Sequence, residues 1–115
     1  MLTSRPLITI ADFQQIDMRV GRIVTAEEFP AARKPSYRLS IDLGALGVRG
    51  SIAALKDHYQ AADLPGRQVV CVVNLPARRI AGHPSEVLVL AAVEASGSLR
   101  LLSTQPEAEL GSHIA

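Results

Sequence analysis

Apolar and polar residues alternate most regularly in residues 37–43, where apolar side chains occupy the odd positions and polar ones the even positions. This period of two is typical of a β-strand with one buried and one exposed face. Residues 19–29 are rich in Val, Ile and Thr and predict a long first strand that bends near Gly21. Residues 48–54 follow a glycine-containing turn and predict a third strand.

The second half of the chain predicts further strands. Residues 69–73 are apolar at every position, which indicates a central strand or one that lies against a partner. Residues 86–94 and 99–102 predict two more strands, separated by a Ser-Gly-Ser turn. Between these elements we expect a short helix or helical turn at 55–63 and a long ordered loop at 74–85.

One helix start is visible near the N-terminus. Thr9 and Asp12 have the spacing of a helix N-cap followed by an acid in the first turn, and they predict a short helix that ends before Asp17. Five or six strands with one short helical connection favour an all-β fold, a small closed barrel. Residues 87–93 are almost uncharged, which fits either a subunit interface or an ordinary buried strand.

Composition limits the chain to one folded domain, because it has 115 residues of which 48% are apolar and 20% charged. Its one cysteine, Cys71, excludes an internal disulfide and fits a reducing compartment. The valines around Cys71 predict a buried thiol with a raised pKa and little reactivity. No apolar run approaches the ~20 residues of a membrane span, so we expect a soluble, cytoplasmic protein without membrane insertion.

The net charge of +1 conceals an uneven distribution. Residues 33–79 contain eight basic and three acidic side chains, a net charge of +5, whereas the rest of the chain carries −4. A basic middle between acidic flanks indicates a polarised surface that attracts phosphates. Arginines that merely solvate half-exposed strands give the same pattern.

Three stretches of the chain together form a recognisable pattern. They are Ile16-Asp17-Met18-Arg19-Val20-Gly21-Arg22-Ile23-Val24 with Ala26-Glu27, then Asp42-Leu43-Gly44, then Asn74-Leu75-Pro76 with Ile80-Ala81-Gly82 and Ser85-Glu86-Val87-Leu88-Val89-Leu90. In this order and at this spacing, they resemble the tRNA-binding domain family. Domains of this kind occur at the C-terminus of bacterial methionyl-tRNA synthetases and as small free-standing dimers. The resemblance covers residues 13–94. Among free-standing members, the loop at 76–86 is most similar to the CsaA group of export-related chaperones.

The resemblance implies a five-stranded OB-fold barrel with short helical elements. It also implies a homodimer whose interface uses N- and C-terminal extensions, here residues 1–12 and the end of the domain at 13–115. Its partners would be tRNA or structured RNA and, for the CsaA group, unfolded preproteins; no cofactor is implied. The sequence departs from the pattern of dedicated tRNA binders in two places, and both favour the CsaA group. Residues 49–55 differ from the Ser-Gly-Ile-type segment of tRNA binders, and Val87-Leu88 stands where tRNA binders usually have Gly-Met.

An OB-fold binds nucleic acid with cations for the phosphates and aromatic rings for the bases. The residues that this implies for nucleic-acid or peptide binding are Arg33, Lys34, Arg38, Arg49, Lys56, Arg78, Arg79, Ser85 and Glu86. For the last two a structural role is the alternative, in which Ser85 bonds loop backbone and Glu86 pairs with an arginine such as Arg79. Asn74 is expected to hold loop backbone.

Stacking platforms and catalytic groups are scarce. Tyr37 alternates with Arg38, so its ring is expected to point inward. The three histidines have no metal-ligand spacing to one another or to Cys71, and the chain has no phosphate-binding glycine loop and no nucleophile elbow. We therefore expect a binding protein with no metal and no catalytic activity.

Two hypotheses remain open. In the first, a dimer presents two basic faces to a folded RNA such as tRNA. In the second, an apolar groove near the dimer seam, lined by residues such as Phe29, Tyr37 and Leu55, accepts unfolded polypeptide without any physiological RNA ligand. RNA binding should weaken steeply with salt, whereas peptide binding in an apolar groove should persist.

Overall fold

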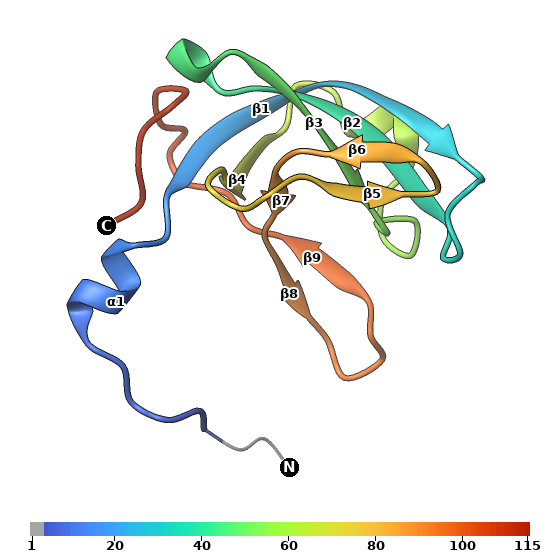
Figure 1. Ribbon diagram of the computed structural model, residues 1–115. Helices are drawn as coiled ribbons and strands as arrows, with labels where there is room; N and C mark the ends of the chain where they lie inside the picture. The colour runs from blue at the N-terminus through green and yellow to red at the C-terminus, as the bar shows by residue number, and fades with distance from the viewer. Residues whose placement is uncertain (1–3) are drawn as a thin grey trace.

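The computed structural model describes residues 4–115, and a curled five-stranded antiparallel sheet forms its centre (Figure 1). The strands lie in the order β3–β2–β1–β4–β7. Two separate hairpins, β5–β6 and β8–β9, project from this sheet. The elements are α1 (Ile10–Gln14), β1 (Met18–Phe29), β2 (Ser36–Asp42), η1 (Gly44–Leu46), β3 (Val48–Ala53), η2 (Ala61–Asp63), β4 (Gln68–Val72), β5 (Arg78–Ile80), β6 (His83–Ser85), β7 (Leu88–Val89), β8 (Ala91–Val93) and β9 (Leu99–Leu101).

The sheet is joined into a barrel where β3 meets the segment 85–87. The Glu86 amide donates to the Gly50 carbonyl at 2.9 Å, and the Ser51 hydroxyl donates to the Val87 carbonyl at 2.8 Å. The same segment continues into β7, which pairs with β4. Residues 85–89 therefore act as the fifth strand between β3 and β4, and the architecture is an OB-fold.

Aliphatic side chains fill the barrel. Its fully buried residues include Ile23, Leu39, Ile41, Leu64 and Val69. A glycine at position 21 allows β2 to approach, because a Cβ there would lie 2.6 Å from Ile41 Cγ2. The apolar half of the alternating segment 37–43 thus forms one wall of the core.

The N-terminal segment lies outside the barrel. Thr9 caps α1, and Thr9 and Asp12 form the reciprocal pair of bonds of a capping box. No residue of α1 is buried, and the chain before it extends away from the sheet (Figure 1). Leu7 is 100% exposed and Ile10 71% exposed, so this arm presents apolar side chains to its surroundings.

The C-terminal segment, by contrast, folds back on its own barrel. The amides of Gly111 and Ile114 donate to the carbonyls of Val20 and Met18, both at 2.8–2.9 Å, along the start of β1. Gln68, buried in β4, bonds both backbone groups of Ala108. The C-terminal segment therefore packs along β1 and β4 of the same chain.

Most predicted elements are confirmed, and two are wrong. The strands at 19–29, 37–43, 48–54 and 69–73 and the helix after Thr9 are present within one or two residues. The segment 74–85 is not a loop throughout, since it contains the β5–β6 hairpin. The single strand predicted at 86–94 is divided at Leu90, because β7 pairs with β4 while β8 pairs with β9. Within residues 4–115, no helix is long and apolar enough to cross a bilayer.

Candidate nucleic-acid interface

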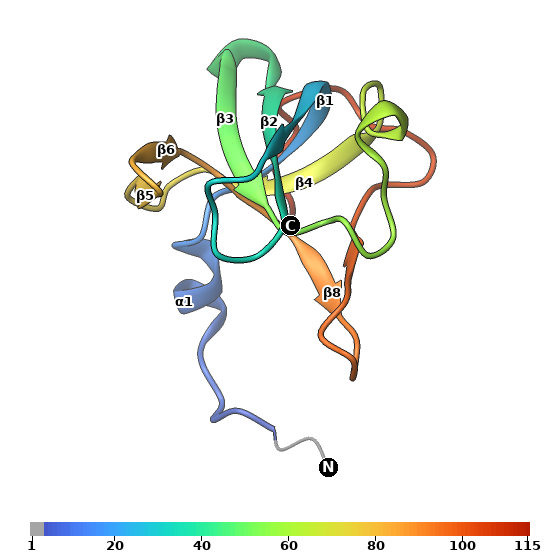
Figure 2. The ribbon, with the colours of Figure 1, turned by 90° about the vertical axis from the view of Figure 1, so that its right-hand side faces the viewer.

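A hollow of about 480 Å³ lies between the β1–β2 loop and the β5–β6 hairpin. Figure 2 looks onto this side of the molecule, with the hairpin on one side of the loop and β8 on the other. We call this hollow the basic groove. Its charged walls and apolar floor are formed chiefly by Arg33, Lys34, Arg78, Arg79, Ile52 and Ala54.

The hairpin wall depends on a tight turn. The two residues between β5 and β6, Ala81 and Gly82, both have positive φ values, 48° and 81°. Positive φ at both central positions is the pattern of a type I′ turn, which suits the twist of a two-residue hairpin. The Arg79 guanidinium donates to the Gly82 carbonyl at 2.8 Å and so reinforces the turn.

Two contacts hold the hairpin to the barrel. At its tip, the His83 ring packs edge-on against Phe29 at the end of β1, with 5.1 Å between ring centroids. At its base, Ser85 and Glu86 bind the exposed edge of β3. The Ser85 hydroxyl accepts the Ile52 N–H at 3.0 Å, and Glu86 Oε1 accepts the Gly50 N–H at 3.0 Å.

In this geometry Ser85 and Glu86 have the structural role, and a ligand contact by either side chain stays a prediction. Both side chains bond backbone, and Glu86 does so on β3 rather than pairing with Arg79, so that predicted ion pair is wrong. Asn74 likewise bonds backbone, accepting from Asp17 and donating to Gln15, as predicted.

The floor belongs to the outer face of β2 and β3. Arg38 lies directly opposite Ile52 in the β2–β3 register, so its exposed side chain adjoins the floor on the same face. Arg38 also lies opposite Glu27 of β1, which offsets part of its charge. Arg49 is opposite the buried Ile41, and so occupies the other face of β3, away from the basic groove.

Among residues 4–115, the four cations of the groove have no carboxylate partner, although Arg79 also donates to the Gly82 carbonyl. Among residues 4–115, the ion pairs within 4.0 Å engage four cationic side chains, Arg19, Arg22, Lys56 and Arg100, besides His58. None of the groove's four cations is among them. Unpaired cations in a hollow attract phosphate or carboxylate more strongly than isolated surface charges, because the low-dielectric walls focus their field.

Lys56 differs from the other predicted cations. Its ammonium bonds the Glu28 carboxylate and lies 5.4 Å from the centre of the Tyr37 ring. It lines a neighbouring hollow rather than the basic groove. The structure thus gathers Arg33, Lys34, Arg78 and Arg79 at one place, with Arg38 beside them, and leaves Arg49 and Lys56 elsewhere.

Within the described part of the chain, no aromatic side chain lines the basic groove. Tyr37 is 4% exposed and donates its hydroxyl to the Tyr59 carbonyl at 2.8 Å, which confirms its inward orientation. Phe29 is also buried. Charge and shape, rather than base stacking, are therefore what this groove offers to a ligand.

Neither the Cys71 thiol nor the metal-ligating residue types among residues 4–115 form a reactive centre. Cys71 is buried, and burial raises the pKa of its thiol to about 12, which confirms the predicted burial and raised pKa. Among residues 4–115, no three His, Cys, Asp or Glu side chains gather in the way that a metal ion requires.

The chain matches a known protein family over most of its length. The family described as "Putative tRNA binding domain" matches residues 18–113, and the chain belongs to that family. Within it, two solved structures share both sequence and fold with this chain. Chaperone CsaA of Bacillus anthracis is 43% identical with a TM-score of 0.92, covering 96% of this chain and all of that one. CsaA of Picrophilus torridus is 39% identical with a TM-score of 0.88, covering 95% of this chain and all of that one.

A second group of relatives consists of much longer enzymes. Methionine–tRNA ligase of Porphyromonas gingivalis is 38% identical over 107 residues, which cover 93% of this chain. The chain spans about 15% of the length of that ligase. The match therefore concerns one domain of the ligase.

Proposed function

We propose that this protein binds the phosphate backbone of tRNA or another structured RNA in the basic groove, and that it does so without catalysing a reaction. The observation that carries the proposal is the gathering of Arg33, Lys34, Arg78 and Arg79 around one hollow, whose lining by residues 4–115 includes no carboxylate. Membership of the tRNA-binding family supports it. The absence of aromatic rings from the groove favours a folded RNA, recognised by shape and charge, over a single strand.

We further propose that the protein works as a cytoplasmic homodimer. The arm around Leu7, Ile8 and Ile10 exposes more apolar surface than a segment of this length needs, and no part of α1 is buried in its own subunit. A second copy offers an equivalent arm with the same exposed apolar side chains. Burial of these side chains between two subunits would stabilise the dimer through the hydrophobic effect.

A second candidate function is chaperone-like binding of unfolded polypeptide during export. The observation that favours it is the apolar floor of the basic groove, where Ile52, Ala54 and Ile80 adjoin the cations. Such a floor suits an apolar side chain, and the cations suit nearby acidic residues. The similar structures from two organisms carry the name chaperone CsaA. In this case no RNA would be the physiological ligand.

A paired salt titration tests the two functions. Labelled tRNA and a labelled, permanently unfolded polypeptide are titrated separately with the protein at 50 and 300 mM salt. Four phosphate contacts predict that log K for tRNA falls with log[salt] with a slope of roughly −3. Absence of tRNA binding even at low salt contradicts the first function, and absence of polypeptide binding at both salt concentrations contradicts the second.

A further inference from the structure

A second hollow, of about 520 Å³, adjoins the basic groove and shares Lys34 and Ala54 with it. It lies between the end of the β1–β2 loop, the segment after β3 and the β8–β9 hairpin. We call it the hairpin hollow. Its other lining residues are Pro35, Lys56, Asp57, Val93, Ser96, Gly97 and Leu99.

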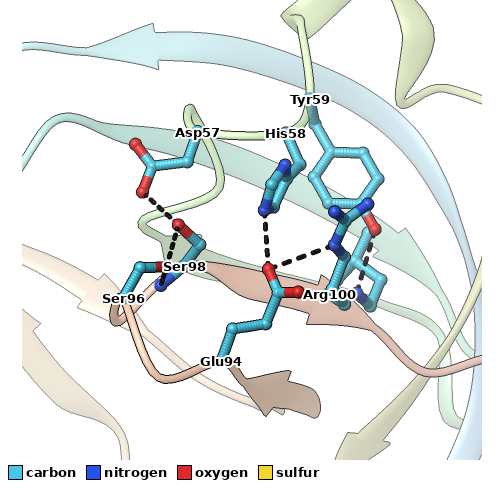
Figure 3. A network of polar contacts seen from close by, with 8 residues as sticks. Asp57, His58, Tyr59, Glu94, Ser96, Ser98 and Arg100 are labelled. Carbon is cyan, nitrogen blue, oxygen red and sulfur yellow. Dashed lines mark hydrogen bonds and ion pairs between the residues drawn. The ribbon is translucent and has the colours of Figure 1, made fainter.

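A polar network fixes the hairpin wall of this hollow (Figure 3). Glu94 at the end of β8 accepts from Arg100 at 3.2 Å and bonds His58 at 2.8 Å. The Tyr59 hydroxyl accepts the Leu101 N–H at 3.0 Å, while the Tyr59 carbonyl accepts from the buried Tyr37 hydroxyl. The β8–β9 hairpin is therefore fastened to the segment after β3, and the hollow exists before any ligand arrives.

The chemistry of the hairpin hollow differs from that of the basic groove. The charge of Lys56 is already neutralised by Glu28. Asp57 is exposed, receives one hydrogen bond on Oδ2 from the Ser98 hydroxyl at 3.0 Å, and has no cationic partner within 4.0 Å among residues 4–115. An ionised carboxylate has about four acceptor positions, so most of them remain free.

The carboxylate and the apolar lining of the hairpin hollow determine which kind of ligand it suits. A phosphate would be repelled by Asp57, whereas a neutral group with N–H donors would be attracted. The apolar side chains of Pro35, Val93 and Leu99 offer a surface for a flat, weakly hydrated ring. A nucleobase has both properties, and Lys34, on the boundary between the hollows, is placed to hold the phosphate next to it.

We propose that the hairpin hollow binds an unpaired guanine base of the RNA whose backbone occupies the basic groove. Guanine carries two adjacent donors, N1–H and the N2 amino group, which match the two oxygens of the Asp57 carboxylate. Adenine and cytosine each offer an amino group beside an acceptor, and uracil offers one N–H between two carbonyl oxygens. This inference rests on the proposed RNA-binding function and adds a base preference to it.

Pentanucleotides test the preference without tertiary structure. Fluorescence anisotropy at low salt compares UUGUU with UUUUU, UUAUU and UUCUU, using the full-length protein. A bidentate contact predicts that UUGUU binds at least about fivefold tighter than UUUUU. In D57N the preference should fall below about twofold, because the amide presents a donor where guanine needs an acceptor. The control D63N removes a carboxylate from η2, which lines neither hollow, and should keep the wild-type preference.

The outcomes separate this inference from the function on which it rests. Equal or undetectable binding of the four oligonucleotides beside normal tRNA binding, or an unchanged preference in D57N, overturns the guanine site while leaving salt-dependent tRNA binding intact. Failure of both tRNA and oligonucleotides to bind overturns both. Displacement of UUGUU from the wild type by an apolar peptide, without displacement of tRNA, would assign the hairpin hollow to polypeptide and also overturn the guanine site.

Discussion

The Glu86 carboxylate accepts the backbone N–H of Gly50 at 3.0 Å and so takes a place on the edge of β3 that a neighbouring strand's carbonyl would otherwise fill. Ser85 does the same for Ile52. Two adjacent side chains thereby join β3 to the last part of the barrel, directly beside the wall of the basic groove.

Removal of the Glu86 acceptor should destabilise the barrel. In E86A the Gly50 N–H loses its partner, and we expect the free energy of unfolding to fall by about 1 kcal/mol. E86Q keeps an amide oxygen at the same position, so its free energy of unfolding should fall by no more than about half as much as that of E86A. Urea denaturation followed by circular dichroism measures both. Equal losses in the two variants would show that the charge, and not the hydrogen bond to β3, is what matters.

The sequence predicts a secondary-structure element of this fold when the pattern that specifies the element lies within a few neighbouring residues. The alternation at 37–43, the apolar run at 69–73 and the cap at Thr9 are encoded within a few residues, and all three are present. The β5–β6 hairpin was missed because Ala81, at φ 48°, is not a residue that usually marks such a turn. The division at Leu90 has no local signal either, since every residue of 87–92 is apolar.

The basic groove could be predicted only in part, because it is formed by residues that lie far apart in the sequence. Eight cations in residues 33–79 indicated a basic region, but their sequence order does not say which ones converge. Arg33 and Arg78 share a groove because β1, β2 and the β5–β6 hairpin meet there. Alternation within β3 places Arg49 on the face opposite Ile52, but only the strand register shows that the groove lies on the Ile52 side.

The Cys71 thiol should be almost inert in the folded protein. Burial raises its pKa from 9.0 to about 12, which lowers the thiolate fraction at a given pH by about a thousandfold. We expect iodoacetamide, a thiol-alkylating reagent, to modify Cys71 at pH 8 only when urea unfolds the chain. Mass spectrometry of samples with and without urea gives the comparison. Rapid modification of the folded protein would contradict the burial of this strand.

The network on the β8–β9 hairpin predicts a pH dependence. Hydrogen bonds from His58 first, and from Arg100 second, hold the pKa of Glu94 below its usual value of 4.5. A carboxyl whose pKa is lowered in the folded state stabilises that state above its unfolded pKa, and the contribution disappears as the pH falls through the lowered pKa. Wild type should therefore be more stable than E94Q at pH 7, and the difference should shrink progressively as the pH falls below 4.5. Thermal denaturation at pH 7 and at a series of lower pH values measures it, and a difference that does not shrink with falling pH would contradict this assignment.

The homodimer makes a prediction about the N-terminal arm. At micromolar concentration, light scattering should give twice the chain mass of 12.3 kDa. Replacing Leu7, Ile8 and Ile10 by serine removes exposed apolar side chains that lie outside the buried core, so this variant should fold and yet dissociate to monomers. A matched substitution of Val24, exposed on β1, should leave the mass unchanged. A wild-type mass near 12.3 kDa would overturn the dimer.

The most direct measurement for the central claim is tRNA affinity after charge reversal on the two faces of the sheet. R78E places a carboxylate in the basic groove, whereas R49E makes the same change on the opposite face of β3. We predict that R78E weakens tRNA binding at 50 mM salt by more than about tenfold and makes the salt dependence less steep, while R49E stays within about threefold of wild type. Equal losses in both variants, or a larger loss in R49E, would contradict the assignment of RNA binding to the basic groove.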